Sequence, residues 1–116
     1  MNLEEIRNHC IKKPGVTEEF PFDSQILVFK VFGKIFFLTD VVNPVSINVK
    51  CDPEMVVELR EKYDTILPGF HMNKKHWITI MLKGHYGNKE ILGWIDHSFR
   101  LVVSDLPQKV RKNLSY

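Results

Sequence analysis

The chain has 116 residues, of which 44% are hydrophobic and 26% are charged. This composition is typical of one soluble globular domain and excludes a disordered, collagen-like or disulfide-dense protein. The 16 Lys and Arg residues against 14 Asp and Glu residues give a net charge of +2, which is small for a dedicated nucleic-acid-binding protein. No apolar run approaches the roughly 18 residues that span a bilayer. Because residues 1–5 also carry acid where a signal peptide is basic, we expect a cytoplasmic protein without membrane contact.

The first half of the chain predicts a helix followed by strands. Residues 2–13 combine an Asn-x-x-Glu start, apolar residues at helical spacing and a Pro-Gly stop directly after them. Residues 25–31 and 35–39 are rich in β-branched and aromatic side chains, and the glycine-containing segment 32–34 suits a tight hairpin between them. Residues 46–50 alternate between polar and apolar side chains, as a half-buried strand does.

The second half predicts two longer helices, one further strand and a short terminal helix. Residues 52–63 begin with Asp-Pro-Glu, a strong helix start. Residues 65–75 contain Pro-Gly and are predicted to be irregular, whereas 77–82 have strand composition. A helix capped by Asn88 is expected to reach about residue 103, and a short basic helix is expected over residues 108–114.

These elements predict a single α+β domain over residues 1–116. Its sheet is expected to be an antiparallel meander with helices packed on one face. In the strand at 46–50, Ile47 and Val49 are expected to face the core. The polar residues of the same strand, Ser46, Asn48 and Lys50, would form a polar sheet face.

Several single residues carry structural expectations of their own. Cys10 and Cys51 are the only cysteines, and a separation of 41 positions makes no metal or redox pair, so we expect two free and mostly buried thiols. Trp94 lies beside the apolar stripe of the predicted long helix. In the same helix, Asp96 is spaced to pair with Arg100.

The charge is distributed unevenly along the chain. Residues 65–89 and 107–116 contain no Asp or Glu and together carry +7, which leaves −5 for the rest. Lysines interleaved with aromatic residues suit a nucleic-acid backbone, because lysine neutralises phosphate and aromatic rings stack on bases. Composition alone favours the other interpretation, a solvated sheet edge that lysine protects from pairing. The cations of the two segments are Lys74, Lys75, Lys83, Lys89, Lys109, Arg111 and Lys112.

The histidines and cysteines suggest no standard metal site. His71 and His76 are five positions apart, and a third ligand would have to come from His85, Cys51 or Cys10. This spacing matches no zinc pattern. We therefore expect the histidines to hydrogen-bond to the backbone or to face solvent, and we expect no metal and no cofactor.

Three carboxylates surround the segment at residues 20–22. Glu18, Glu19 and Asp23 could divide acid and base roles if burial separated their pKa values, but no nucleophile lies beside them in the sequence. We interpret this stretch as a turn whose two phenylalanines pack into the core.

Cys51 is the one candidate nucleophile. It precedes a predicted helix start, where the helix dipole lowers a thiol pKa, and His71 or His76 would have to act as its base. The simpler interpretation is a structural thiol. Because the chain also lacks GxGxxG, P-loop, GxSxG and HExxH motifs, we expect a protein that is not an enzyme.

Several motifs along the whole chain, in register, resemble the MmcQ/YjbR family. The resemblance implies a small, single-domain bacterial protein with a CyaY-like α+β fold and no catalytic residues or cofactor. The family is usually described as DNA-binding, because its sheet has been likened to a double-wing motif. The matching stretches are Pro14-Gly15-Val16-Thr17-Glu18-Glu19-Phe20-Pro21-Phe22-Asp23, Lys50-Cys51-Asp52-Pro53-Glu54, His71-Met72-Asn73-Lys74-Lys75-His76-Trp77, Asp96-His97-Ser98-Phe99 and Leu106-Pro107.

A CyaY-like fold also suggests frataxin-type iron handling. That activity uses a dense acidic ridge on the first helix and strand. Here the acidic residues of the first helix, Glu4 and Glu5, are mixed with Arg7, Lys12 and Lys13, so we do not expect iron handling.

The leading hypothesis is a DNA-binding module, and we expect it to be a monomer. Lys74 and Lys75 would contact phosphates, and Trp77 would stack on a base or support the loop. Asn73 and His76 would donate or accept hydrogen bonds. Further charge would come from Lys50, Lys109, Arg111 and Lys112.

The alternative hypothesis is a pocket for a small anionic ligand or a protein partner. Polar groups that converge around an aromatic side chain are typical of such pockets. In this interpretation the 71–77 loop folds beside the segment at 22–23. The lining would consist of His71, Asn73, Lys75, His76, Trp77, Phe22 and Asp23.

Overall fold

Capping residues set the starts of the helices in the computed structural model, which describes residues 1–69 and 72–112. Helix α1 (Leu3–Ile11) begins at Asn2, whose side-chain oxygen accepts a hydrogen bond from the backbone N–H of Glu5 at 2.9 Å. Helix α2 (Pro53–Lys62) begins after Asp52, whose carboxylate accepts a hydrogen bond from the backbone N–H of Glu54. Both starts confirm the sequence prediction, because each side chain satisfies an N–H that the helix leaves free.

Helix α3 (Asn88–Ser104) is the longest helix. Its cap is Gly87 rather than the predicted Asn88, and the carboxylate of Glu90 accepts a hydrogen bond from the Gly87 N–H at 2.8 Å. Helix α4 (Gln108–Arg111) follows it closely. The prediction that α4 reaches residue 114 concerns positions outside the described residues.

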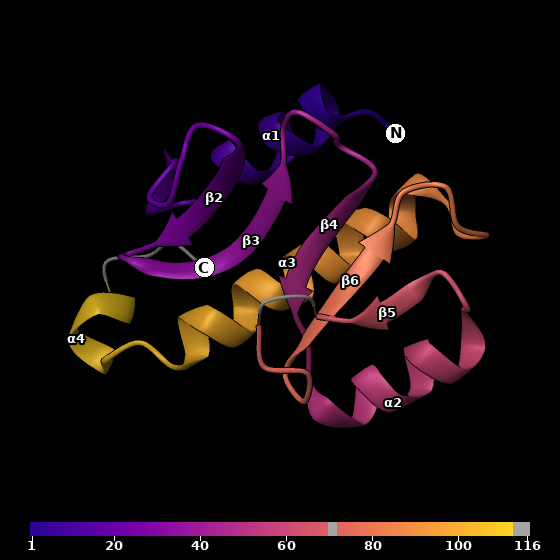
Figure 1. The fold of residues 1–116 in the computed structure, drawn as a ribbon. Coiled ribbons are helices and arrows are strands. Elements are labelled where there is room, and N and C mark those ends of the chain that lie inside the picture. The colour runs from indigo at the N-terminus through magenta and orange to yellow at the C-terminus, as the bar shows by residue number, and fades with distance from the viewer. Residues whose placement is uncertain (70–71, 113–116) are drawn as a thin grey trace.

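Six strands form one antiparallel sheet in the order β1-β2-β3-β4-β6-β5 (Figure 1). The strands β2 to β4 form the predicted meander, and β6 then pairs with β4. Strands β1 and β5, at the two edges, fall in segments predicted to be turns or irregular. The bounds are β1 (Val16–Glu19), β2 (Ile26–Val31), β3 (Lys34–Asp40), β4 (Ser46–Lys50), β5 (Ile66–Pro68) and β6 (Trp77–Met81).

The hairpin between β2 and β3 shows how the sequence shapes the sheet. Phe32 and Gly33 have φ angles of +45° and +81°, the left-handed pair that a two-residue turn needs. Beyond the turn, Lys30 pairs with Ile35 while Phe29 pairs with Phe37, so β3 carries one extra residue. This bulge directs two consecutive phenylalanines, Phe36 and Phe37, into the core, where both are fully buried.

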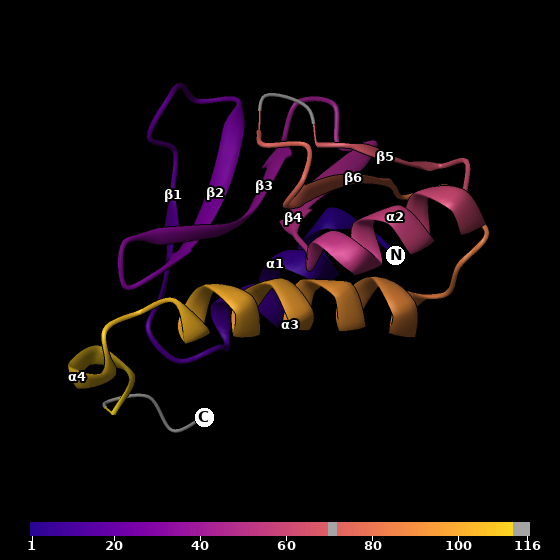
Figure 2. The same ribbon diagram turned by 90° about the horizontal axis from the view of Figure 1, so that it is seen from below.

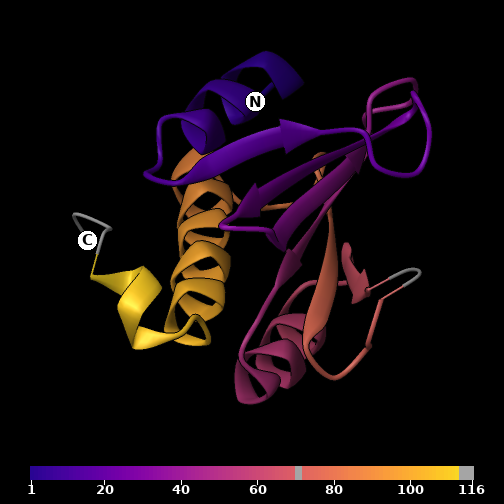
Figure 3. The ribbon, with the colours of Figure 1, turned by 90° about the vertical axis from the view of Figure 1, so that its left-hand side faces the viewer.

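Helices α1, α2 and α3 cover one face of the sheet, as predicted, and Figure 2 shows all three on the same side. The buried stripe of α3 packs on the strands through residues such as Ile95 and Phe99. The opposite face, which we call the open face, carries the β1–β2 and β5–β6 connections (Figures 2 and 3). Among the described residues, no helix combines the length and apolarity needed to cross a membrane.

The register confirms that Asn48 lies on the sheet face opposite Ile47 and Val49, but the centre of that face is buried and partly apolar. Register places Val28, Leu38, Asn48 and Thr79 in one row across the open face. Val28 is fully buried, and Asn48 is only 9% exposed. The Thr79 hydroxyl donates to Asn48 Oδ1 at 2.6 Å, so the amide oxygen is bonded within the sheet.

A serine hydroxyl joins β3 and β4 where their pairing ends. At this end of the two strands, the last residue pair is Phe37 with Val49. One residue further on, Ser98 of α3 donates to the Phe36 carbonyl at 2.6 Å and accepts from the Lys50 N–H at 2.8 Å. The hydroxyl therefore takes the place of a strand partner for both backbones.

Replacing this serine with alanine is expected to lower the free energy of unfolding by about 1–3 kcal/mol, because two buried backbone groups lose their partner. Urea denaturation followed by far-UV circular dichroism measures the change. Ser104→Ala is the matched control, since that residue is exposed and its hydroxyl donates to the Leu101 carbonyl of its own helix. Equal, small effects of the two substitutions would show that the Ser98 bridge is not stabilising.

Candidate functional site

Strand β6 divides the first basic segment between the two ends of the sheet. Lys74 and Lys75 precede the strand, whereas Lys83 and Lys89 follow it. The acid-free stretch at 65–89 therefore does not form one basic patch, although its charges are adjacent in sequence.

One end of the sheet nevertheless gathers cations from several segments. The β2–β3 hairpin, the end of β4 and the start of β6 lie there, because Val31 pairs with Lys34 and Lys50 pairs with Trp77. The end of α3 and α4 also lie at this end (Figure 1). We call this surface the basic end, and its cations are Lys34, Lys50, Lys74, Lys75, Lys109, Arg111 and Lys112.

The two predicted basic segments are not adjacent at this end. Residues 72–76 lie on the open side of the sheet, while α4 lies on the helix side, and all three views separate them (Figures 1, 2 and 3). Lys34 and Lys50 lie between them, because both line a hollow that Trp77 and Asp105 also border. The acidic residues Asp52, Glu54 and Asp105 belong to the same end, so its charge is mixed but mainly positive.

The 73–76 turn is stabilised by hydrogen bonds within the turn and to β4. Asn73 Oδ1 accepts from the Lys75 N–H at 2.8 Å, and the Asn73 carbonyl accepts from the His76 N–H at 3.2 Å. The His76 carbonyl in turn accepts from the Cys51 N–H at 2.7 Å, which ties the turn to β4. Asn73 and His76 thus position the turn, and Lys74 and Lys75 lie exposed on it. His71 lies outside the described residues.

Trp77 supports this turn and does not offer its ring for stacking. The side chain is only 8% exposed. Its backbone carbonyl accepts from the Gly69 N–H at 3.1 Å, and a Cβ at Gly69 would lie 2.6 Å from the Trp77 Cβ. Of the two roles that the sequence suggested for Trp77, the geometry agrees with the supporting one.

Lys50 is paired, although the sequence suggested a free charge. Its ammonium lies 3.0 Å from Asp105 Oδ2. Sequence reasoning missed Asp105, and it also missed Lys34 on the far side of the same hollow. Neither residue carried a signal in the sequence, because the proximity of β3, β4 and α3 arises only in the folded chain.

The predicted pocket is wrong in its arrangement. Phe22 and Asp23 lie in the β1–β2 connection, at the sheet end opposite residues 72–76 (Figures 1 and 3). Asp23 is used locally, where its carboxylate accepts from the N–H groups of Gln25 and Ile26 at 2.8 and 3.0 Å. Phe20 and Phe22 are 43% and 67% exposed, so the expectation that both pack into the core is also wrong.

The two thiols are buried, as predicted. Cys10 and Cys51 are unpaired, and they are 0% and 2% exposed. Burial raises the pKa of each thiol to about 12. A nucleophilic cysteine needs the opposite shift, so Cys51 has the character of a structural thiol. In the described ranges, 1–69 and 72–112, no three His, Cys, Asp or Glu residues gather in a way that could hold a metal ion.

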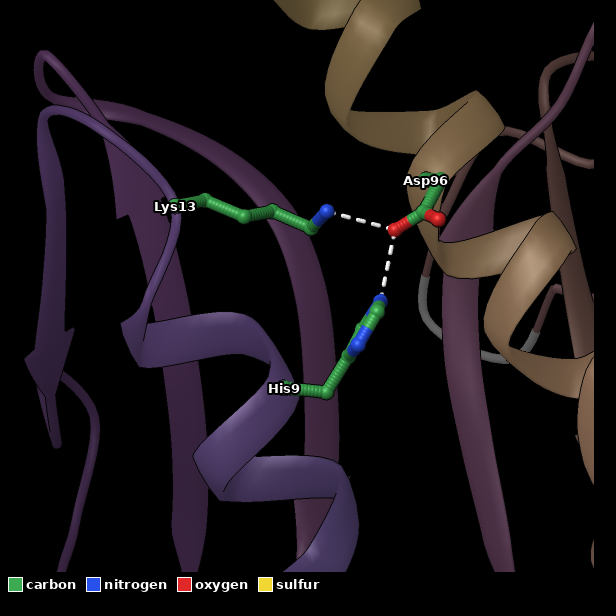
Figure 4. A network of polar contacts seen from close by, with 3 residues as sticks. All are labelled: His9, Lys13 and Asp96. Carbon is green, nitrogen blue, oxygen red and sulfur yellow. Dashed lines mark hydrogen bonds and ion pairs between the residues drawn. The ribbon is translucent and has the colours of Figure 1, made fainter.

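The stretch Asp96-His97-Ser98-Phe99 joins α3 to four different neighbours. Asp96 contacts Lys13 and lies 2.6 Å from His9 Nε2, both at the end of α1, instead of pairing with Arg100 (Figure 4). His97 Nε2 accepts from the Asp52 N–H at 3.3 Å. With Ser98 between the strands and the Phe99 ring against Phe36, every residue of this motif has a structural role.

The Asp96 contacts predict a pH-dependent stability. Burial opposes ionisation, but hydrogen bonds from Lys13 and His9 outweigh it and hold the pKa of this carboxyl below its ordinary 3.8. A carboxylate with a lowered pKa stabilises the fold above its ordinary pKa, and this contribution is lost as the pH falls through the lowered value.

Asp96→Asn is therefore expected to cost about 1–2 kcal/mol at pH 6 and progressively less as the pH falls below 4. Urea denaturation of both proteins between pH 2.5 and 7 measures the difference. A cost that stays constant over this range would contradict the assignment.

The sequence comparisons identify the family. The YjbR family model matches residues 11–101. The chain belongs to the YjbR family. It is 30% identical to uncharacterized protein YjbR of Escherichia coli K12 over 115 residues, covering 98% of each chain. It is 34% identical to uncharacterized protein YbdF of Escherichia coli O157:H7 over 112 residues, covering 96% of this chain and 92% of the other.

Solved structures share the YjbR-family fold described above. Protein DR2400 of Deinococcus radiodurans, a DUF419 domain, superposes with a TM-score of 0.89 at 36% identity, over 96% of this chain and 86% of the other. A Pseudomonas syringae protein has a TM-score of 0.73 at 33% identity, over 87% of this chain and 98% of its own. These matches confirm the α+β fold and the predicted family membership.

Proposed function

We propose that this YjbR-family protein binds the sugar–phosphate backbone of duplex DNA through the basic end and catalyses no reaction. The observation that carries the proposal is the gathering of cations from three separate segments at one end of the sheet. Lys74 and Lys75 lie in the β5–β6 connection, Lys34 begins β3 at the β2–β3 hairpin, and Lys109 and Arg111 lie in α4.

The state of these side chains supports contact with phosphate. Lys34, Lys74 and Lys75 are exposed, as are Lys109 and Arg111. Within the described part of the chain, none of the five forms an ion pair. Their charges are therefore available to neutralise phosphates and release counterions, which is the main source of sequence-independent affinity.

The burial of Trp77 favours duplex over single-stranded DNA. Proteins that bind single strands stack bases on exposed aromatic rings. Trp77, next to Lys74 and Lys75, is only 8% exposed, and Phe32 in the β2–β3 hairpin, at 45%, is a single ring, so the described part of the basic end has no row of exposed rings for successive bases. Binding is therefore expected to depend on backbone charge and to show little sequence preference.

A salt titration tests the proposal. Fluorescence anisotropy with a labelled duplex is expected to give a slope of log K against log salt of about −4 to −5, if four to six phosphates are neutralised. The double variant Lys74→Gln/Lys75→Gln is expected to flatten the slope by about 2. The control Lys83→Gln/Lys89→Gln removes the same charge from the opposite sheet end and is expected to leave the slope unchanged.

Two results would overturn the proposal. One is binding at low salt that does not weaken as salt is raised. The other is an equal effect of the two double variants, because then only the net charge of the molecule would matter and not its basic end.

A further inference from the structure

We propose a second binding site, for a small amphipathic monoanion, in the hollow where β3, β4, β6 and α3 meet. The ligand class is a carboxylate or sulfonate carried on a flat apolar body. The hollow has a volume of about 310 Å³ and is lined by Lys34, Ile35, Lys50, Trp77, Val102 and Asp105. This inference goes beyond the proposed function and stands whether or not the chain binds DNA.

The hollow exists because β3 and β4 separate. Their last residue pair at this end is Phe37 with Val49, and the Ser98 hydroxyl bridges the next position. Beyond that bridge the start of β3 and the end of β4 have no strand between them to fill the space. The volume lies at the small end of the range for ligand pockets, about 300–1,000 Å³.

The lining divides into an apolar part and a charged part. Ile35, which is half-buried, supplies most of the apolar surface, and Val102 and Trp77 add only small exposed parts, at 4% and 8% exposure. Lys34 and Lys50 supply two ammonium groups from neighbouring strands. An apolar body with one anionic end matches this division, since the body replaces water on the apolar surface while the anion meets the lysines.

Asp105 determines which ligand charge the hollow favours. Its carboxylate lies 3.0 Å from the Lys50 ammonium, but its side chain is 68% exposed. An exposed partner of this kind can turn toward water at little cost. An incoming anion therefore replaces Asp105 at Lys50. Two lysines and one aspartate leave a local charge of +1, which balances a monoanion and disfavours a dianion.

The probe for this site is 8-anilinonaphthalene-1-sulfonate, an aromatic monoanion whose fluorescence rises in apolar surroundings. Titration into the folded wild-type protein is expected to give saturable binding. Lys34→Gln and Lys50→Gln are each expected to weaken it several-fold. Asp105→Asn is expected to strengthen it several-fold. Lys83→Gln, an exposed lysine at the other sheet end, is the matched control and is expected to change nothing.

Two competing ligands test whether the hollow prefers a monoanion to a dianion. In the wild-type protein, 1-naphthalenesulfonate is expected to displace the probe at lower concentration than 1,5-naphthalenedisulfonate. Asp105→Asn is expected to bring the displacing concentrations of the two competitors closer together. Lys34 is exposed, so its substitution leaves the fold intact, and circular dichroism checks this.

The proposal is overturned if Lys34→Gln and Lys50→Gln bind the probe as tightly as Lys83→Gln does. It is also overturned if both competitors act alike in the wild-type protein and in Asp105→Asn. Failure of the DNA proposal is seen separately, because Lys74 and Lys75 line no part of this hollow.

Discussion

Phe99→Ala is expected to lower the free energy of unfolding by about 3–5 kcal/mol, the usual cost of deleting a fully buried ring. Phe99 is 1% exposed, and its ring centroid lies 5.3 Å from that of Phe36 at an interplanar angle of 80°. The Lys13 ammonium lies 5.2 Å from the same centroid. The substitution therefore opens a cavity between α3 and the bulge of β3, and it removes a contact to α1. Urea denaturation measures the loss.

Phe22→Ala is the matched control for this prediction. The same atoms are removed from a side chain that is 67% exposed in the β1–β2 connection. A change within about 0.5 kcal/mol is expected for such a surface position. If Phe22→Ala cost as much as Phe99→Ala, the described exposure of this connection would be wrong.

Neutralising both sides of the basic end is expected to abolish salt-sensitive DNA binding. Five exposed cations change to glutamine in the variant, so the slope of log K against log salt is expected to flatten by about 4 to 5 and the affinity in low salt to fall about a hundredfold or more. Fluorescence anisotropy with a labelled duplex measures both quantities. The substituted residues are Lys74, Lys75, Lys109, Arg111 and Lys112.

The two halves of this variant separate the contributions of the two sides. The pair in the β5–β6 connection is expected to flatten the slope by about 2, and the three substitutions in and after α4 by about 3. An unchanged slope when only the α4 cations are removed would contradict a surface that spans the sheet end.

Long elements with local signals could be predicted from the sequence. The capped starts of α1 and α2 and the hairpin around Gly33 appear in the structure where the pattern placed them. The edge strands β1 and β5 were missed, because they contain only 4 and 3 residues. So short a strand shows no periodicity, and it forms mainly because it pairs with the free edge of the adjacent strand.

Partners distant in sequence explain the other errors. Asp96 was expected to pair within its helix, but the end of α1 brings Lys13 and His9 to it. The burial of Asn48 depends on Thr79, a residue 31 positions away. For Asp96 the tertiary structure replaced a predicted local partner, and for Asn48 it buried a side chain that the strand pattern placed on a polar face.

The candidate site was predictable only in part. Sequence order grouped Lys74 and Lys75 with Lys83 and Lys89, and the five residues of β6 place these pairs at opposite sheet ends. Lys34 joins the site through a hairpin that the sequence did predict. Charge counted along a chain therefore indicates that cations are available, whereas strand topology decides which of them share a surface.

The most direct test of the basic end is to observe which backbone amides respond to DNA. A ¹⁵N-labelled sample titrated with a short duplex in low salt reports this by nuclear magnetic resonance. Chemical-shift changes are expected in the β2–β3 hairpin, at the end of β4, in the 73–76 turn and in α4, and they are expected to disappear as salt is raised. Changes concentrated at residues 82–89 or 20–25, at the opposite end of the sheet, would contradict the account.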